Sequence, residues 1–149
     1  MSYQLIRGAI EMVTALELNN AGATYVFYDN VPYTQPGADE TYAEIALSFT
    51  DVKHDTVGCC GNDDVGGNVT VYINTPTGKG ARAGEDIALE VLKVWAITGA
   101  FDGYLMNGHV RMRNLDGPRL ILAQSATGRN SSQSHAQHVI SAAFRGQLA

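Results

Sequence analysis

The feature that most constrains the fold is the two-residue alternation of apolar side chains in residues 41–51. A period of two residues is typical of a β-strand, because successive side chains of a strand point to opposite faces of the sheet. Residues 68–74 repeat this pattern. The apolar positions are Ala43, Ile45, Leu47, Phe49, Val69, Val71 and Ile73, and those between them include Glu44, Ala46, Ser48, Thr70 and Tyr72. We therefore expect two strands of a sheet that has one buried face.

Two other segments, residues 2–19 and 81–98, have the apolar spacing of amphipathic helices. The first stripe comprises Ile6, Ile10 and Val13, widened by Leu5, Met12 and Leu16, and the second comprises Ala88, Val91, Leu92 and Trp95, extended by Gly84 and Ile87. Gly22 and Gly99 are expected to end the two helices, because glycine readily adopts the left-handed conformation that often follows a helix.

The remaining segments alternate between strand-forming and turn-forming residues. Further strands are predicted at residues 24–29, 104–113, 120–126 and 137–147, the last with Ile140, Ala142 and Phe144 on the core side. Residues 30–40, 76–80 and 127–135 carry turn residues, and residues 53–67, with four glycines, are predicted to form a projecting loop between two central strands. Because runs of strands are separated by a single helix, the order predicts an α+β fold: a mostly antiparallel sheet with two helices packed on one face.

Length, charge and hydropathy exclude several classes of protein. A chain of 149 residues is expected to form one domain, residues 1–149. No run approaches the roughly 18 apolar residues that span a bilayer, and the first 20 residues lack a secretory pattern, so we expect a cytoplasmic product. The net charge of −5 argues against tight nucleic-acid binding. Charge is nevertheless uneven: residues 1–102 contain 14 acidic and 5 basic side chains, whereas residues 103–149 contain 1 acidic and 5 basic.

No combination of residues predicts catalysis, a cofactor or a metal site. Gly78-Lys79-Gly80 opens a helix but departs from the phosphate-binding P-loop, because Ile73 stands where its first glycine belongs and Gly80 where Ser or Thr would hold magnesium. Cys59 and Cys60 are adjacent, which disfavours a structural disulfide, and with His54 and Asp63 they match no standard zinc spacing. A small nucleotide-binding enzyme that uses the Gly78–Gly80 turn stays a remote alternative.

Two features are most easily explained by contact with a partner. The segment 53–67 is too long and glycine-rich for a tight hairpin, and Arg111 and Arg113 alternate with Val110 and Met112, which places two like charges on one strand face. The candidate interface residues are Lys53, His54, Asp55, Asp63, Asp64, Arg111, Arg113 and Arg119.

Several short motifs together resemble those of a known protein family. Tyr28-Asp29-Asn30-Val31-Pro32-Tyr33 follows a strand, residues 67–80 read GNVTVYINTPTGKG before the second helix, and residues 138–144 read HVISAAF near the end of the chain. This order of motifs resembles the tail terminator proteins of long-tailed bacteriophages over most of the chain. Residues 103–119 depart from the family pattern and form an additional segment.

The resemblance implies a structural virion protein rather than an enzyme. It implies a homo-oligomeric ring, a hexamer, that caps the tail tube at its head-proximal end, ends tube elongation and joins the tail to the head or neck. The partners would be further copies of the chain, the tail tube protein and a neck or head completion protein. DNA would pass through the channel without specific binding, and no membrane is involved. A tail tube subunit or a head–tail connector is the alternative within the structural class.

Overall fold

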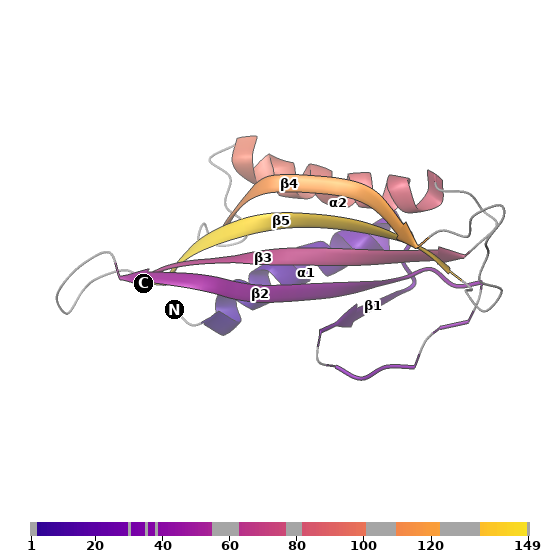
Figure 1. Ribbon diagram of the computed structural model, residues 1–149, viewed down its shortest axis with the longest axis horizontal. Helices are drawn as coiled ribbons and strands as arrows, with labels where there is room; N and C mark the ends of the chain where they lie inside the picture. The colour runs from indigo at the N-terminus through magenta and orange to yellow at the C-terminus, as the bar shows by residue number, and fades with distance from the viewer. Residues whose placement is uncertain are drawn as a thin grey trace.

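The computed structural model describes residues 3–29, 31–34, 36–37, 39–54, 63–76, 82–100, 110–122 and 135–148. Within these ranges the chain forms two long helices and five strands (Figure 1). Their bounds are α1 Tyr3–Ala21, β1 Tyr25–Tyr28, β2 Tyr42–His54, β3 Asp63–Pro76, α2 Arg82–Ala100, β4 Val110–Leu122 and β5 His135–Leu148. No helix in the described part of the chain is long and apolar enough to cross a membrane.

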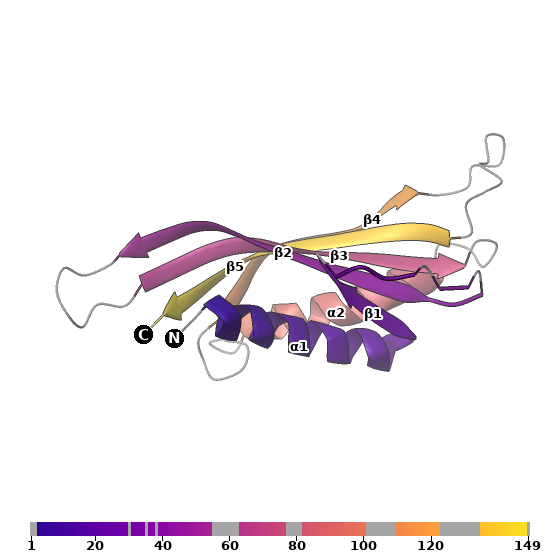
Figure 2. The same cartoon turned by 90° about the horizontal axis from the view of Figure 1, so that it is seen from below.

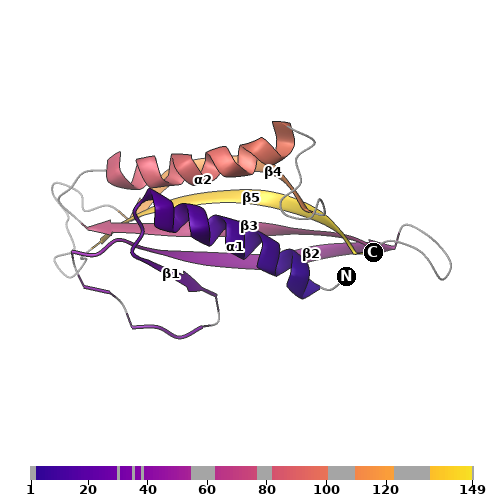
Figure 3. The ribbon, with the colours of Figure 1, turned by 180° about the vertical axis from the view of Figure 1, so that it is seen from behind.

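The five strands form one sheet in the order β1-β2-β3-β5-β4. β1 pairs with β2 in parallel, and the three remaining pairs are antiparallel. Both helices lie on the same side of this sheet, as the turned view in Figure 2 and the rear view in Figure 3 show. The predicted α+β fold, a mostly antiparallel sheet with two helices on one face, is confirmed.

The core lies between the two helices and the sheet face that they cover. The predicted inward residues of β2, β3 and β5 are buried, apart from Phe49, which is half-buried and packs its ring edge against Phe144 at 5.6 Å between centroids. The two helices meet where the indole Nε1 of Trp95 donates a hydrogen bond of 3.1 Å to the buried Thr14 hydroxyl. The core residues of the helices are Ile6, Ile10, Leu18, Ile87, Ala88, Val91 and Trp95.

The prediction that Met12 and Leu16 widen the buried stripe of α1 is wrong, because their side chains are 59% and 61% exposed. The helix instead buries Ile10, Thr14 and Leu18, which follow one another at intervals of four residues. A helical face advances with this spacing, and the polar Thr14 is tolerated inside because the Trp95 indole satisfies its hydroxyl. α2 also continues past Gly99, which was expected to end it, to Ala100.

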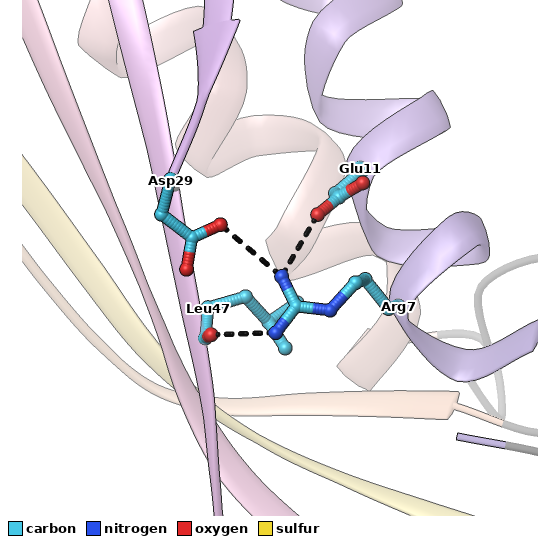
Figure 4. Close-up of polar contacts among 4 residues, drawn as sticks. All are labelled: Arg7, Glu11, Asp29 and Leu47. Atoms are coloured by element: carbon cyan, nitrogen blue, oxygen red, sulfur yellow. Dashed lines mark hydrogen bonds and ion pairs between the residues drawn. The ribbon is translucent and has the colours of Figure 1, made fainter. Parts of the chain in front are cut away.

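Arg7 anchors α1 to the sheet (Figure 4). Its guanidinium donates to the Glu11 carboxylate at 3.1 Å, to the Asp29 carboxylate at 3.2 Å and to the main-chain oxygen of Leu47 at 2.9 Å. The guanidinium also lies 5.8 Å from the centre of the Phe49 ring. One planar cation thereby connects a helix, the end of β1 and the middle of β2, a use for which the fork of arginine donors is well suited.

The predicted projecting loop at residues 53–67 is wrong at both ends. β2 runs to His54 and β3 begins at Asp63, and these two residues pair directly. Gly67 lies inside β3. A Cβ at this position would come within 2.2 Å of the main-chain oxygen of Ser48 and 2.6 Å of the Phe144 ring. Close packing, not a turn, therefore requires this glycine. Residues 55–62, which include Asp55, Cys59 and Cys60, lie outside the described residues.

The two strands predicted at 104–113 and 120–126 are, in the described part of the chain, one edge strand, β4. Its pairing with β5 shifts register at three places, and Asn114 and Gly117 have positive φ angles of 53° and 108°. Each shift breaks the alternation of side chains, so the sequence pattern reads as two short strands rather than one. Residues 77–81, 101–109 and 123–134 lie outside the described residues.

Candidate functional site

The two arginines singled out on β4 lie on the sheet face opposite the helices. Val110 and Met112 are buried in the core, whereas Arg111 and Arg113, between and after them, are exposed. The predicted alternation of apolar and arginine side chains between the two faces of the strand is confirmed. Within the described part of the chain, neither arginine has an ion-pair partner. Figure 1 looks onto this outer face, with the strands in front of both helices.

A third arginine, Arg145 of β5, joins the first two through the pairing of the strands. Arg111 lies directly opposite Arg145, and Arg113 lies opposite Ala143, which makes Arg113 a diagonal neighbour of Arg145. Like charges that face each other across a strand pair are destabilising. Sequence reasoning did not select Arg145 as an interface residue, because the register between β4 and β5 is set by contacts between segments far apart in the chain.

These strands enclose a shallow polar hollow of about 220 Å³ on the outer face, which we call the arginine hollow. Its lining residues are Thr50, Gly66, Gly67, Asn68, Arg113, Asn114, Ala143, Phe144 and Arg145. Two guanidinium groups and two carboxamides therefore surround an open space over two glycines. Such a set of donors suits a carboxylate or a phosphate oxygen, since arginine binds both in a forked geometry.

Arg119, the third arginine of the predicted interface, does not belong to this hollow. It lies opposite Val139, four positions along β5 from the partner of Arg113. Its guanidinium is 3.6 Å from the carboxylate of Asp116, and both side chains are largely exposed. An exposed pair of this kind contributes little to stability, but it leaves Arg119 locally neutralised.

The other predicted interface residues lie at the far end of the β2–β3 pair. Lys53 pairs with Asp64 and His54 pairs with Asp63 along the two strands. The same two aspartates pair with Gln147 and Leu148 of β5. The structure thus brings these four residues together in one end of the sheet, and Asp55 lies outside the described residues.

The edge of the sheet at β1 carries an aromatic cluster. The Tyr33 ring stacks on Phe27 with 3.9 Å between centroids, and Tyr42 lies edge-on to both rings and to His135. Burial and the nearby Glu44 carboxylate raise the pKa of Tyr33 and of Tyr42. These rings hold the segment after β1 against the sheet, which is a structural role.

The two histidines near the last strand differ in their surroundings. His135 places Nε2 2.8 Å from the main-chain oxygen of Glu40. His138 is 1% exposed and, among the described residues, neither of its ring nitrogens has a hydrogen-bond partner. Burial lowers its pKa, and the charge of Glu85 opposes part of this effect. No group of three His, Cys, Asp or Glu side chains in the described part of the chain is arranged to hold a metal ion.

Comparison with known proteins supports the fold. No family model and no curated protein matches the chain. Several solved structures match; one of them, of a protein that carries no functional name, matches over 100% of this chain and 98% of its own length, with a TM-score of 0.63 and 22% sequence identity. A likeness at this identity shows a shared fold alone, because one fold can carry many functions.

Proposed function

We propose that this protein is a structural subunit of a bacteriophage tail: a tail terminator that forms a ring, caps the tail tube, ends its elongation and joins it to the head or neck. The proposal is supported by the sequence resemblance described above. In the fold, the motif at residues 28–33 begins at the last residue of β1, residues 67–76 of the second motif lie in β3, and the motif at 138–144 lies in β5. The resemblance therefore follows the framework of the domain rather than one loop.

The observation that carries the proposal is that two exposed arginines and two exposed carboxylates lie on opposite sides of the sheet. Arg111 and Arg113 are exposed on the outer face, whereas Glu85 and Asp86 are exposed on α2, which covers the other face. A closed ring requires each copy to present two different surfaces that fit each other. Charges that the sheet keeps apart within one copy can meet between copies and set their orientation.

The acidic balance of the whole chain agrees with a role around DNA that does not include binding it. The net charge is −5. An assembly of several such chains repels a polyanion on average, which would let DNA pass without adhering to the wall.

Light scattering on the purified protein and electron microscopy with assembled tail tubes test the proposal together. A terminator forms rings of defined mass that sit on tube ends and stop added tube protein from extending them. A tube subunit would instead polymerise by itself, and a connector would bind heads but not tube ends. A protein that remains monomeric at high concentration and never associates with tubes contradicts the proposal.

A further inference from the structure

Beyond its structural role, the aromatic cluster at β1 leaves ring surface uncovered. Val26 packs against the core, so Tyr25 and Phe27 on either side of it lie on the outer face of the sheet. The Tyr33 ring stacks on Phe27 with only 2° between the planes. Tyr33 is nevertheless 39% exposed, and Tyr25 is 41% exposed. The uncovered part of the Tyr33 ring is therefore the face and edge turned away from Phe27.

The carboxylate of Glu44 borders these rings. It accepts a hydrogen bond of 3.5 Å from the Tyr33 hydroxyl. Along the strands, Glu44 pairs with Phe27 of β1 and with Tyr72 of β3, so aromatic residues flank it on both sides. The side chain is only partly exposed and, within the described ranges, has no ion-pair partner. A carboxylate that is partly removed from water in this way gains more from a nearby cation than a fully solvated one does.

The arginine of this copy that shares a row with Glu44 is too far away to neutralise it. The row of paired residues continues from Glu44 through Tyr72 and Val139 to Arg119 of β4. Arg119 is thus three strands away, which is about 14 Å at the usual spacing of β-strands. Its guanidinium already lies 3.6 Å from the carboxylate of Asp116.

The part of the chain that forms this surface is acidic. Residues 8–52 contain no lysine, arginine or histidine, and their acidic residues are Glu11, Glu17, Asp29, Asp39, Glu40, Glu44 and Asp51. The nearby His135 places Nε2 2.8 Å from the main-chain oxygen of Glu40, so that nitrogen is already engaged. A surface of this composition attracts a cationic group and repels an anionic one.

We propose that this surface, formed by Tyr25, Phe27, Tyr33 and Glu44 and called the aromatic–acidic site, binds an arginine side chain that a segment of another protein presents. The planar guanidinium can stack on the uncovered face of Tyr33, and its paired N–H donors can reach the Glu44 carboxylate. Lysine fits less well, because an ammonium is a point charge with no planar surface. Val31, 54% exposed and two residues before Tyr33, adds apolar surface beside the site. The inference goes beyond the proposed tail function and does not depend on it.

A peptide titration of the full-length, isotope-labelled protein, followed by nuclear magnetic resonance, tests the proposal. The probes are blocked peptides of the form Gly-Gly-X-Gly-Gly, in which X is arginine, lysine or citrulline, the uncharged counterpart of arginine. The arginine peptide should shift the resonances of residues 25–33 and 42–44. Its dissociation constant should be at least about threefold lower than that of the lysine peptide, because only the guanidinium both stacks and forks. The citrulline peptide should bind more weakly than either.

Substitutions at the site separate the contributions of the ring and the charge. Glu44→Gln keeps the shape and removes the charge, and Tyr33→Leu keeps an apolar side chain and removes the ring. Each should raise the dissociation constant of the arginine peptide by at least about fivefold. Tyr33→Phe retains the ring and should bind within about twofold of the wild type. Glu17→Gln is the matched control, since it removes one charge from α1 on the covered side of the sheet and should leave binding unchanged. Circular dichroism verifies that each variant is folded.

The outcomes decide both the ligand and its source. Equal affinity for the arginine and lysine peptides, or unchanged binding to Glu44→Gln, overturns the proposal, because the response then reflects a general acidic surface or another site. Self-association that is lost alike in Glu44→Gln and in the double variant R111E/R113E identifies the occupant as a second copy and overturns the assignment to another protein. A wild type that never forms rings but binds the arginine peptide contradicts the proposed function alone. Rings without peptide binding contradict only this inference.

Discussion

The imidazole of His138 lies directly against the backbone of Gly84, so closely that a Cβ at Gly84 would come within 2.2 Å of Nδ1. The first turn of α2 is therefore seated on a buried side chain of β5. His138 is 1% exposed, so an added methyl group at Gly84 would press on a buried ring. This contact determines how near the start of α2 can approach the sheet.

Gly84→Ala is expected to destabilise the protein by about 1–3 kcal/mol, because overpacking forces the imidazole or the helix to shift. Gly8→Ala in α1 is the matched control, since a Cβ there would meet nothing within 4 Å. That substitution should stabilise the protein by up to about 1 kcal/mol, because alanine favours helix over glycine. Urea unfolding of the two variants measures both effects, and equal changes in the same direction would contradict the close contact.

Stability is expected to fall as the pH decreases below about 6.5, the ordinary pKa of histidine. Burial lowers the pKa of His138 in the folded state, with a smaller opposing effect from Glu85. Between the two pKa values, the unfolded chain binds a proton that the folded chain does not. The stability that this group contributes is therefore complete above its unfolded-state pKa and is lost as the pH falls through its folded-state pKa. The slope reaches at most about 1.4 kcal/mol per pH unit.

His138→Leu tests this pH dependence, because it removes the titrating group and keeps an apolar side chain at the site. The variant should show a flatter dependence of the free energy of unfolding on pH between about 5 and 7. The slope, not the absolute stability, is the informative quantity. A wild-type slope in the variant would assign the pH dependence to other groups.

Thr14→Val is expected to cost about 1–3 kcal/mol, since it leaves the buried Trp95 Nε1 without its acceptor at 3.1 Å. Adding Trp95→Phe removes the donor that has lost its acceptor. The double variant should therefore lose less stability than the sum of the losses in the two single variants. The protein has a single tryptophan, so circular dichroism rather than fluorescence must follow unfolding in the variants that lack it. Strict additivity would mean that the hydrogen bond contributes no coupling between the helices.

Arg7→Met is expected to lower stability by about 1–2 kcal/mol, because it removes one hydrogen bond to the Leu47 oxygen and two partly exposed ion pairs. Arg7→Lys should recover only part of the loss, since one ammonium cannot reproduce the fork that reaches Glu11, Asp29 and Leu47 together. Thermal unfolding at low and high salt distinguishes the ionic part from the rest. A lysine variant as stable as the wild type would show that charge alone suffices.

Local patterns in the sequence predict the elements of this fold well. The two-residue period of β2 and β3 and the helical spacing of α2 depend on side chains that are close in the sequence, and burial in the structure follows them. The alternation of Arg111 and Arg113 with Val110 and Met112 was readable for the same reason.

What the sequence could not supply depends on contacts between distant segments. Arg145 is opposed to Arg111 only through the register of β4 with β5, and that register contains three shifts that no local pattern reveals. Gly66 and Gly67 resembled loop residues because glycine also marks turns, whereas Gly67 is required by its closeness to Phe144. Leu16 has a helical apolar spacing in α1 but is exposed, because it lies off the face on which Ile10, Thr14 and Leu18 are buried.

The irregular edge strand β4 has a consequence for how copies of this chain can associate. Its register shifts, the positive φ angles at Asn114 and Gly117, and Pro118, which has no N–H to donate, leave no straight row of main-chain donors and acceptors along this edge. A strand from another molecule therefore cannot anneal here and lengthen the sheet. The chain can therefore be crowded at high local concentration during assembly without the β4 edge nucleating amyloid-like fibrils.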